Sequence, residues 1–239
     1  MQGDGIVREN LISCRQRMSR ACARSGRPAS DVTLVAVTKG VAAERVEEAV
    51  AAGVAFLGES RLQETLAKHG RISRFARERG AALSWHLVGH LQTNKVREAV
   101  RIFDVIHSVD SLRVAEAIEK QASRMDKVQE VFLEVNVAAE AGKYGFAVAE
   151  VFGALAAMGP WPHVRVTGLM TVAPFVEDAE GVRPVFRRLR ELRDGLNADP
   201  ELRPRLCHLS MGMTDDFEVA IEEGATIVRL GRAVFGERS

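Results

Sequence analysis

Short apolar runs alternate with longer amphipathic segments along most of the chain. The apolar runs are rich in Val, Ile and Leu, and they predict eight strands over Thr33–Thr38, Val54–Gly58, Ser84–Gly89, Asp104–Val109, Glu130–Val137, Arg165–Thr171, Leu206–Ser210 and Thr226–Leu230. The segments between them carry apolar residues at helical spacing and predict helices over Ala43–Ala52, Arg61–Arg79, Gln92–Val100, Ser111–Arg124, Val148–Met158, Asp178–Ala198 and Thr214–Glu223. One more helix is expected over Ile6–Ala23, ahead of the first strand.

Eight strands alternating with helices predict the α/β class and a (β/α)8 TIM barrel with an extra N-terminal helix. The alternative is a doubly wound open sheet, which would need a glycine-rich turn after the first strand. That turn reads Thr38-Lys39-Gly40-Val41 and lacks the G-x-G-x-x-G spacing, which favours the barrel. Because no linker or low-complexity segment interrupts the pattern, a single domain over residues 1–239 is expected.

The composition is that of an ordinary soluble globular protein, with 46% hydrophobic and 27% charged residues. A formal net charge of +1 gives no field that would favour nucleic acid or an anionic membrane. The N-terminus is polar, and no apolar run is long enough to span a membrane. Cys14, Cys22 and Cys207 are widely spaced and read as reduced thiols. We therefore expect a cytoplasmic protein with no nucleic-acid or membrane partner.

Lys39 is the first candidate for chemistry, because it ends the strand Leu34-Val35-Ala36-Val37-Thr38. A lysine amine that is desolvated at a strand end has a lowered pKa and can attack a carbonyl to form a Schiff base. A solvated lysine just past a strand is an equally good interpretation of this position alone.

Strand alternation places further polar residues near Lys39. Apolar neighbours suit the helix side of each strand, which turns Glu134, Asn136, Ser210 and Arg229 toward the barrel mouth. A buried arginine needs an acceptor. Glu134 could supply it as a structural ion pair, and a ligand is the functional alternative.

Two glycine-containing loops follow the seventh and eighth strands, where such barrels commonly bind phosphate. Gly212 lies in the first loop and Gly231 in the second, and glycine lets backbone amides approach an anion. Either glycine could instead serve only a tight turn. A nucleophilic lysine, a phosphate site and an inward arginine together indicate pyridoxal 5′-phosphate held as an internal aldimine.

The sequence resembles the pyridoxal phosphate homeostasis proteins, single-domain relatives of the alanine racemase barrel (fold type III). The resemblance rests on residues 34–39, 58–64, 85–95, 168–170, 209–216 and 228–236, and so covers nearly the whole chain. It implies that Lys39 carries the cofactor and that Arg229 faces its pyridine nitrogen. It also implies a phosphate site made by Ser210, Gly212, Gly231 and Arg232.

Three positions depart from the family pattern. Ser60 stands where an asparagine is common, so a contact to the cofactor becomes shorter or is lost. His90 replaces a common proline, and Arg232 replaces a threonine. We expect the backbone amide of Arg232 to bind phosphate, whether or not its guanidinium does.

His86 and His90 have a spacing that would suit a metal on a helix, but they belong to a strand and its exit, and no third ligand is near in sequence. No metal site is therefore expected, and His86 is assigned to hydrogen bonding in the barrel mouth.

The resemblance implies a non-catalytic protein that binds pyridoxal phosphate and takes part in intracellular homeostasis of the vitamin B6 cofactor. The alternative is a pyridoxal-phosphate-dependent racemase or related enzyme. Racemases of this fold take a second base, a tyrosine, from a further domain, whereas Tyr144 is the only tyrosine here. Apoenzymes that use the cofactor are candidate partners, and a monomer or weak dimer is expected.

Overall fold

The computed structural model describes residues 5–202 and 205–237, and in this part of the chain eight parallel strands form a closed barrel. Each strand pairs with its neighbour in sequence, and β8 (Ile227–Leu230) closes the ring on β1 (Thr33–Val37), with Val35 opposite Arg229. The other strands are β2 (Phe56–Glu59), β3 (Ser84–Leu87), β4 (Val105–Val109), β5 (Gln129–Glu134), β6 (Val164–Met170) and β7 (His208–Ser210).

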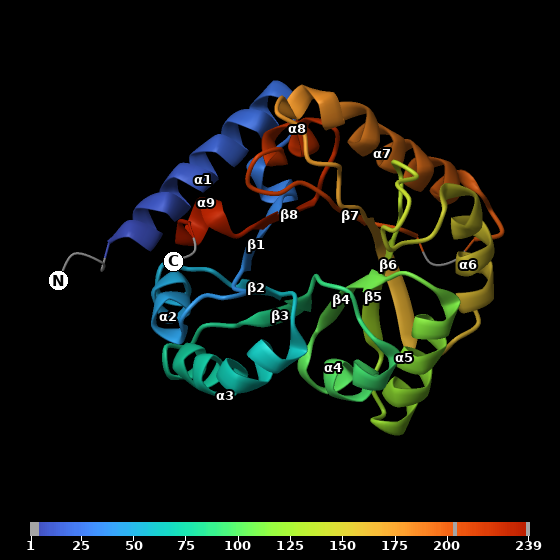
Figure 1. The fold of residues 1–239 in the computed structure, drawn as a ribbon, viewed down its shortest axis with the longest axis horizontal. Helices are drawn as coiled ribbons and strands as arrows, with labels where there is room; N and C mark the ends of the chain where they lie inside the picture. Colours follow the sequence, from blue (N-terminus) through green and yellow to red (C-terminus); the bar gives the residue numbers. More distant parts are fainter. Residues whose placement is uncertain (1–4, 203–204, 238–239) are drawn as a thin grey trace.

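The helices surround the barrel on its outside (Figure 1). They are α1 (Ile6–Arg24), α2 (Ala43–Ala51), α3 (Leu62–Glu78), α4 (Val96–Ile102), α5 (Leu112–Arg124), α6 (Val151–Met158), α7 (Arg183–Ala198), α8 (Phe217–Glu222) and α9 (Arg232–Phe235). Short 3-10 turns η1 (Ala29–Asp31), η2 (Thr93–Lys95), η3 (Val148–Glu150) and η4 (Ala179–Val182) lie between them. This architecture confirms the predicted (β/α)8 barrel and its extra N-terminal helix.

The structure differs from the predicted elements at two places that matter for the site. β5 ends at Glu134 and does not reach Val137, because Phe146 N donates to Glu134 O (2.8 Å) and draws the chain into a turn. The helix predicted over Thr214–Glu223 begins only at Phe217, because Met213 N donates to Asp216 Oδ1 (2.6 Å) and residues 214–216 form a turn.

The barrel interior and the strand–helix layer are separate apolar clusters, as strand alternation predicts. The inner cluster is formed by Val35, Val105, Phe132, Met170 and Ile227. The outer cluster includes the intervening strand residues, such as Val131, Leu133 and Leu209. Some inward side chains therefore fill this inner cluster, and others line the cavity at the barrel mouth.

Helix α1 joins the two ends of the described chain. It lies beside α8 and α9, as the blue and red ribbons show in Figure 1. Asn10 Nδ2 donates to Val234 O (3.1 Å), and Arg17 Nη2 donates to Glu218 Oε2 (2.8 Å). The first contact holds α9, which follows β8 and borders the candidate site, and the second holds α8, which precedes β8. Among the described helices, none has the length and hydrophobicity needed to cross a membrane.

Candidate functional site

A cavity of about 710 Å³ opens at the carboxyl ends of the strands, where barrels of this kind carry their sites. Its lining includes five of the residues predicted for the site, namely Lys39, Ser60, Arg229, Gly231 and Arg232. The remaining lining residues are Val37, Gly40, Arg61, Glu64, Val88, Gly89, His90, Glu134, Tyr144, Val172, Met213, Thr214 and Asp215.

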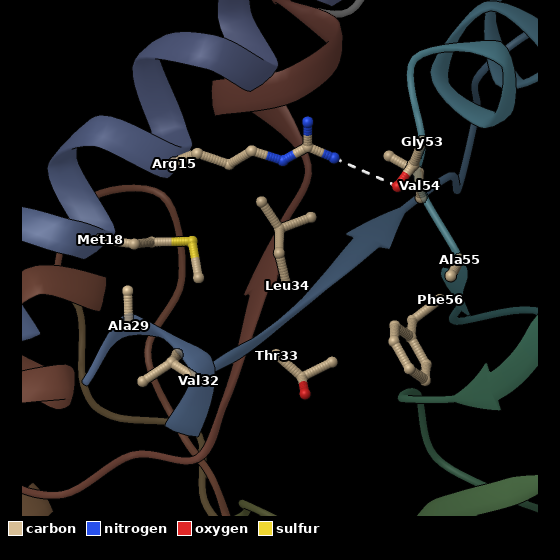
Figure 2. A pocket seen from close by; sticks show the side chains of 10 residues that line it. All are labelled: Arg15, Met18, Ala29, Val32, Thr33, Leu34, Gly53, Val54, Ala55 and Phe56. Atoms are coloured by element: carbon tan, nitrogen blue, oxygen red, sulfur yellow. Dashed lines mark hydrogen bonds between the residues drawn. The ribbon is translucent and has the colours of Figure 1, made fainter. Parts of the chain in front are cut away.

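A smaller cavity of about 300 Å³ lies at the opposite end, between α1 and the starts of β1 and β2 (Figure 2). Its ten lining residues are mainly apolar and include no lysine, histidine or carboxylate. Its cation, Arg15, donates to the carbonyl oxygen of Gly53 (3.1 Å). This end of the barrel therefore offers apolar contacts without a nucleophile, and we assign the candidate site to the carboxyl end.

Side chains of α3 fix the backbone on both sides of Lys39. Lys68 donates its Nζ to the carbonyl oxygen of Thr38 (2.6 Å), and Gly40 N donates to Glu64 Oε2 (2.8 Å). Lys39 thus has an anchored backbone, while the residue itself lines the cavity. Because the backbone is already fixed, less conformational entropy is lost when the Lys39 amine is positioned to react.

Lys68 is neutralised by a buried carboxylate. Its Nζ lies 2.5 Å from Glu59 Oε1, and the same oxygen accepts a hydrogen bond from Thr38 Oγ1. The Glu59 side chain is completely buried, and its Oε2 has no hydrogen-bond partner among the described residues. Burial raises the pKa of Glu59, and the hydrogen bonds from Lys68 and Thr38 oppose that rise.

Arg229 is buried at the base of the cavity and is held by uncharged acceptors. Its Nη1 donates to Ser210 Oγ (2.7 Å) and its Nη2 donates to the carbonyl oxygen of Thr171 (2.9 Å). Among the described residues no ion pair joins it to Glu134, so the structural ion pair considered from the sequence is wrong. Burial lowers the pKa of Arg229 to about 10, against the nearby charges of Glu134 and Asp216.

Ser210 and His86 lie behind the cavity wall and not on it. Ser210 is fully buried, and its Oγ lies 2.9 Å from His107 Nδ1 as well as 2.7 Å from Arg229 Nη1. His86 Nδ1 lies 2.8 Å from His107 Nε2, and its Nε2 lies 3.1 Å from Ser84 Oγ. The expected position of His86 in the barrel mouth is therefore wrong, because β3 places this residue at a deeper level of the interior.

The two loop glycines differ in what the protein requires of them. A Cβ at Gly212 would lie 2.6 Å from Ala220 Cβ and 2.9 Å from Phe217 Cα, and φ is +93°. Gly212 is therefore needed for packing against α8, and it does not line the cavity. A Cβ at Gly231 would meet Val37 at ordinary distances of 3.5 and 3.7 Å. Neighbouring residues thus do not require glycine at 231, which borders the cavity.

Asn136 does not lie in the barrel mouth, and that expectation is wrong. Its Nδ2 donates to Glu140 O (2.9 Å), and its Oδ1 accepts from Glu140 N (3.1 Å). Alternation no longer applies here because β5 ends at Glu134. Asn136 instead lines a separate hollow that includes Arg188.

Glu134 faces the cavity, as alternation predicts. Burial raises its pKa to about 7, with a smaller rise from Asp110 and a lowering by Arg229. The mouth also contains His90, whose Nδ1 lies 2.9 Å from Asp110 Oδ2 and whose ring stacks on Tyr144 with centroids 3.7 Å apart. Tyr144 therefore borders the site.

Sequence reasoning missed two groups that support the site. One is the pair Glu59 and Lys68, since a lysine within an amphipathic helix has the pattern of a solvated residue. The other is His107, which is fully buried within β4. The available signal was a histidine in the middle of a mostly apolar strand.

Residues 10–239 match the family described as "Alanine racemase, N-terminal domain". The pyridoxal phosphate homeostasis protein of Aquifex aeolicus is 43% identical over 230 residues, which cover 96% of this chain and 97% of the relative. The protein of the same name from Escherichia coli is 35% identical and covers 97% of both chains.

Solved structures of similar proteins agree with the family indicated by these sequence matches. A protein of unknown function from Bifidobacterium adolescentis superposes with a TM-score of 0.93 at 36% identity, covering 97% of this chain and 95% of that one. PipY of Synechococcus elongatus, in a structure with PLP bound, superposes with a TM-score of 0.79 at 35% identity, covering 96% and 100%. An alanine racemase from Clostridium difficile, at 15% identity and a TM-score of 0.71, shares the fold. The chain belongs to the alanine racemase N-terminal domain family and, within it, to the pyridoxal phosphate homeostasis proteins.

Proposed function

We propose that this chain binds pyridoxal 5′-phosphate as an imine on Lys39 and acts as a non-catalytic carrier in homeostasis of the vitamin B6 cofactor. The observation that carries the proposal is that Lys39 and Arg229 line one cavity of about 710 Å³. A lysine amine can attach the cofactor aldehyde covalently, and a fixed guanidinium can donate to the ring nitrogen.

The phosphate is assigned to the loops after β7 and β8. Gly231 supports this assignment, because it lines the cavity and its contacts with Val37 do not by themselves require a glycine. The guanidinium of Arg232 is paired with Asp215. We therefore assign the phosphate contact of Arg232 to its backbone N–H. Ser60, which follows β2 and lines the cavity, is proposed as a further polar contact.

The relatives support binding of the cofactor and the homeostasis role. PipY has been solved with PLP bound, and the curated relatives are named homeostasis proteins. When bound, pyridoxal phosphate supplies an electrophilic aldehyde and an electron-accepting ring. An arginine beside the ring nitrogen disfavours protonation of that nitrogen, which weakens the ring as an electron sink. This property disfavours catalysis and suits a protein that holds the cofactor and later releases it unchanged. Cofactor-dependent apoenzymes are the proposed recipients.

A racemase-type enzyme is the second candidate, and Tyr144 is the observation that favours it. Its ring lines the same cavity as Lys39 and stacks on His90, which is fixed by Asp110. A tyrosine at a cofactor site can exchange protons with a substrate. The residue is 57% exposed, however, so its hydroxyl is not held in a desolvated environment.

One experiment separates the two candidates. The protein is saturated with pyridoxal phosphate and incubated with a panel of L-amino acids in D₂O, and exchange of the α-proton is followed by NMR. The carrier predicts a lysine-dependent visible absorbance band with exchange no faster than for free cofactor. Rapid exchange that is lost in Tyr144→Phe would establish the enzyme instead. Failure of the protein to bind the cofactor would refute both.

A further inference from the structure

A hydrogen-bonded chain of buried side chains crosses the barrel behind Arg229. It runs from Arg229 on β8 through Ser210 on β7 and His107 on β4 to His86 and Ser84 on β3. Consecutive polar atoms are 2.7, 2.9, 2.8 and 3.1 Å apart. None of these residues except Arg229 lines the cavity.

One direction of these hydrogen bonds satisfies every buried proton, and it starts from the arginine. A guanidinium can only donate, so Ser210 Oγ accepts from Arg229. Ser210 Oγ has a second lone pair that could accept from His107, but its buried hydroxyl proton would then have no partner among the contacts of the described residues. The arrangement that satisfies this proton has Ser210 donating to His107 Nδ1. This nitrogen is therefore an unprotonated acceptor.

The direction continues through both histidines. Burial lowers the pKa of His107 well below its ordinary value and that of His86 to about 4, so both rings are neutral near pH 7. A neutral His107 that accepts at Nδ1 carries its proton on Nε2 and donates it to His86 Nδ1. His86 then carries its proton on Nε2 and donates it to Ser84 Oγ.

The surroundings of His107 are those of a core residue. It is fully buried, and its ring lies 4.3 Å from that of Phe132, a member of the inner apolar cluster. An apolar ring at this position would avoid the cost of burying two ring nitrogens. The polar ring is explained if its acceptor nitrogen is needed to orient Ser210.

We propose that His107 and His86 are positioning residues that act through Ser210 to hold the Arg229 guanidinium at the cavity. This inference rests on the proposed function, since it concerns the site assigned to the cofactor. It also changes the role of Ser210. Its proton is used by His107 and its lone pair by Arg229, so Ser210 acts through Arg229 and does not donate to the cofactor phosphate.

The first test uses the protein without cofactor. In ¹⁵N-labelled protein, two-bond correlations report which imidazole nitrogen carries the proton. We expect His107 and His86 both to be neutral and protonated at Nε2 near pH 7. A proton on Nδ1 of His107 would overturn the proposed direction. This result does not depend on whether the chain binds pyridoxal phosphate.

The second test compares pyridoxal phosphate with pyridoxal, which lacks the phosphate, by titrating Ser210→Ala and His107→Phe. Loss of the positioning chain should weaken both ligands by about tenfold and to the same degree, as for one lost hydrogen bond to a charged group. His107→Asn, which keeps an acceptor for Ser210, should recover part of the loss and serves as the test variant if His107→Phe does not fold. The proposal fails if Ser210→Ala weakens only pyridoxal phosphate, or if His107→Phe and His107→Asn bind both ligands as the wild type does. A wild type that binds neither ligand would refute the proposed function. The NMR result would still show whether the hydrogen bonds from Arg229 to Ser84 run in the proposed direction.

Discussion

The ammonium of Lys68 lies 2.5 Å from Glu59 Oε1, next to the residue that precedes Lys39. The Lys68 side chain is 10% exposed and that of Glu59 is fully buried. Removing one partner of such a pair leaves an uncompensated charge in the barrel wall. The pair therefore links the stability of the fold to the position of Lys39.

Lys68→Met should lower the free energy of unfolding by about 3–5 kcal/mol, because Glu59 loses its counter-charge while remaining buried. The double variant Lys68→Met/Glu59→Gln should recover part of this loss. Arg165→Ala, which breaks an exposed ion pair with Glu130, should cost less than about 1 kcal/mol and serves as the control. Equal losses in the two single variants, measured by urea denaturation, would contradict this account.

Glu134 should make stability depend on pH. Its folded pKa of about 7 lies above the ordinary 4.5, so the folded protein binds its proton more tightly than the unfolded chain does. Its contribution to stability is fully present below about pH 4.5 and is lost as the pH rises through about 7. The difference in unfolding free energy between wild type and Glu134→Gln should therefore fall over this range and then level off. A difference that grows with pH would show that folding lowers the pKa of Glu134 and does not raise it.

Gly212→Ala and Gly231→Ala form a matched pair. The first should lose about 2–4 kcal/mol of stability, because its Cβ would clash with Ala220 and its φ is positive. The second should change stability by less than about 0.5 kcal/mol. It should nevertheless weaken pyridoxal phosphate binding by about tenfold, because the new methyl group is added to a residue that lines the cavity beside the assigned phosphate site. Thermal denaturation and ligand titration of both variants measure this contrast, and unchanged affinity in Gly231→Ala would argue against a phosphate there.

The barrel could be predicted because each strand is a separate apolar run with a helical segment after it. Alternation also predicted the face on which Lys39, Glu134 and Arg229 lie. Alternation could not predict how far along the barrel axis an inward side chain lies. For this reason His86 and Ser210 were assigned to the barrel mouth, although they lie behind the cavity wall. Asn136 was misplaced because the end of β5 depends on a contact with Phe146, twelve positions from Glu134 along the chain. The Glu59–Lys68 pair likewise depends on a contact between two elements, which local pattern does not encode.

The central claim is that Lys39 carries the cofactor. The protein should be saturated with pyridoxal phosphate and treated with borohydride, which converts an imine into a stable secondary amine, and the product should be mapped by peptide mass spectrometry. The account predicts a phosphopyridoxyl group on the peptide that contains Lys39, and no such group at that site in Lys39→Arg. Modification chiefly at another lysine, such as Lys95 or Lys143, or no modification at all, would contradict it.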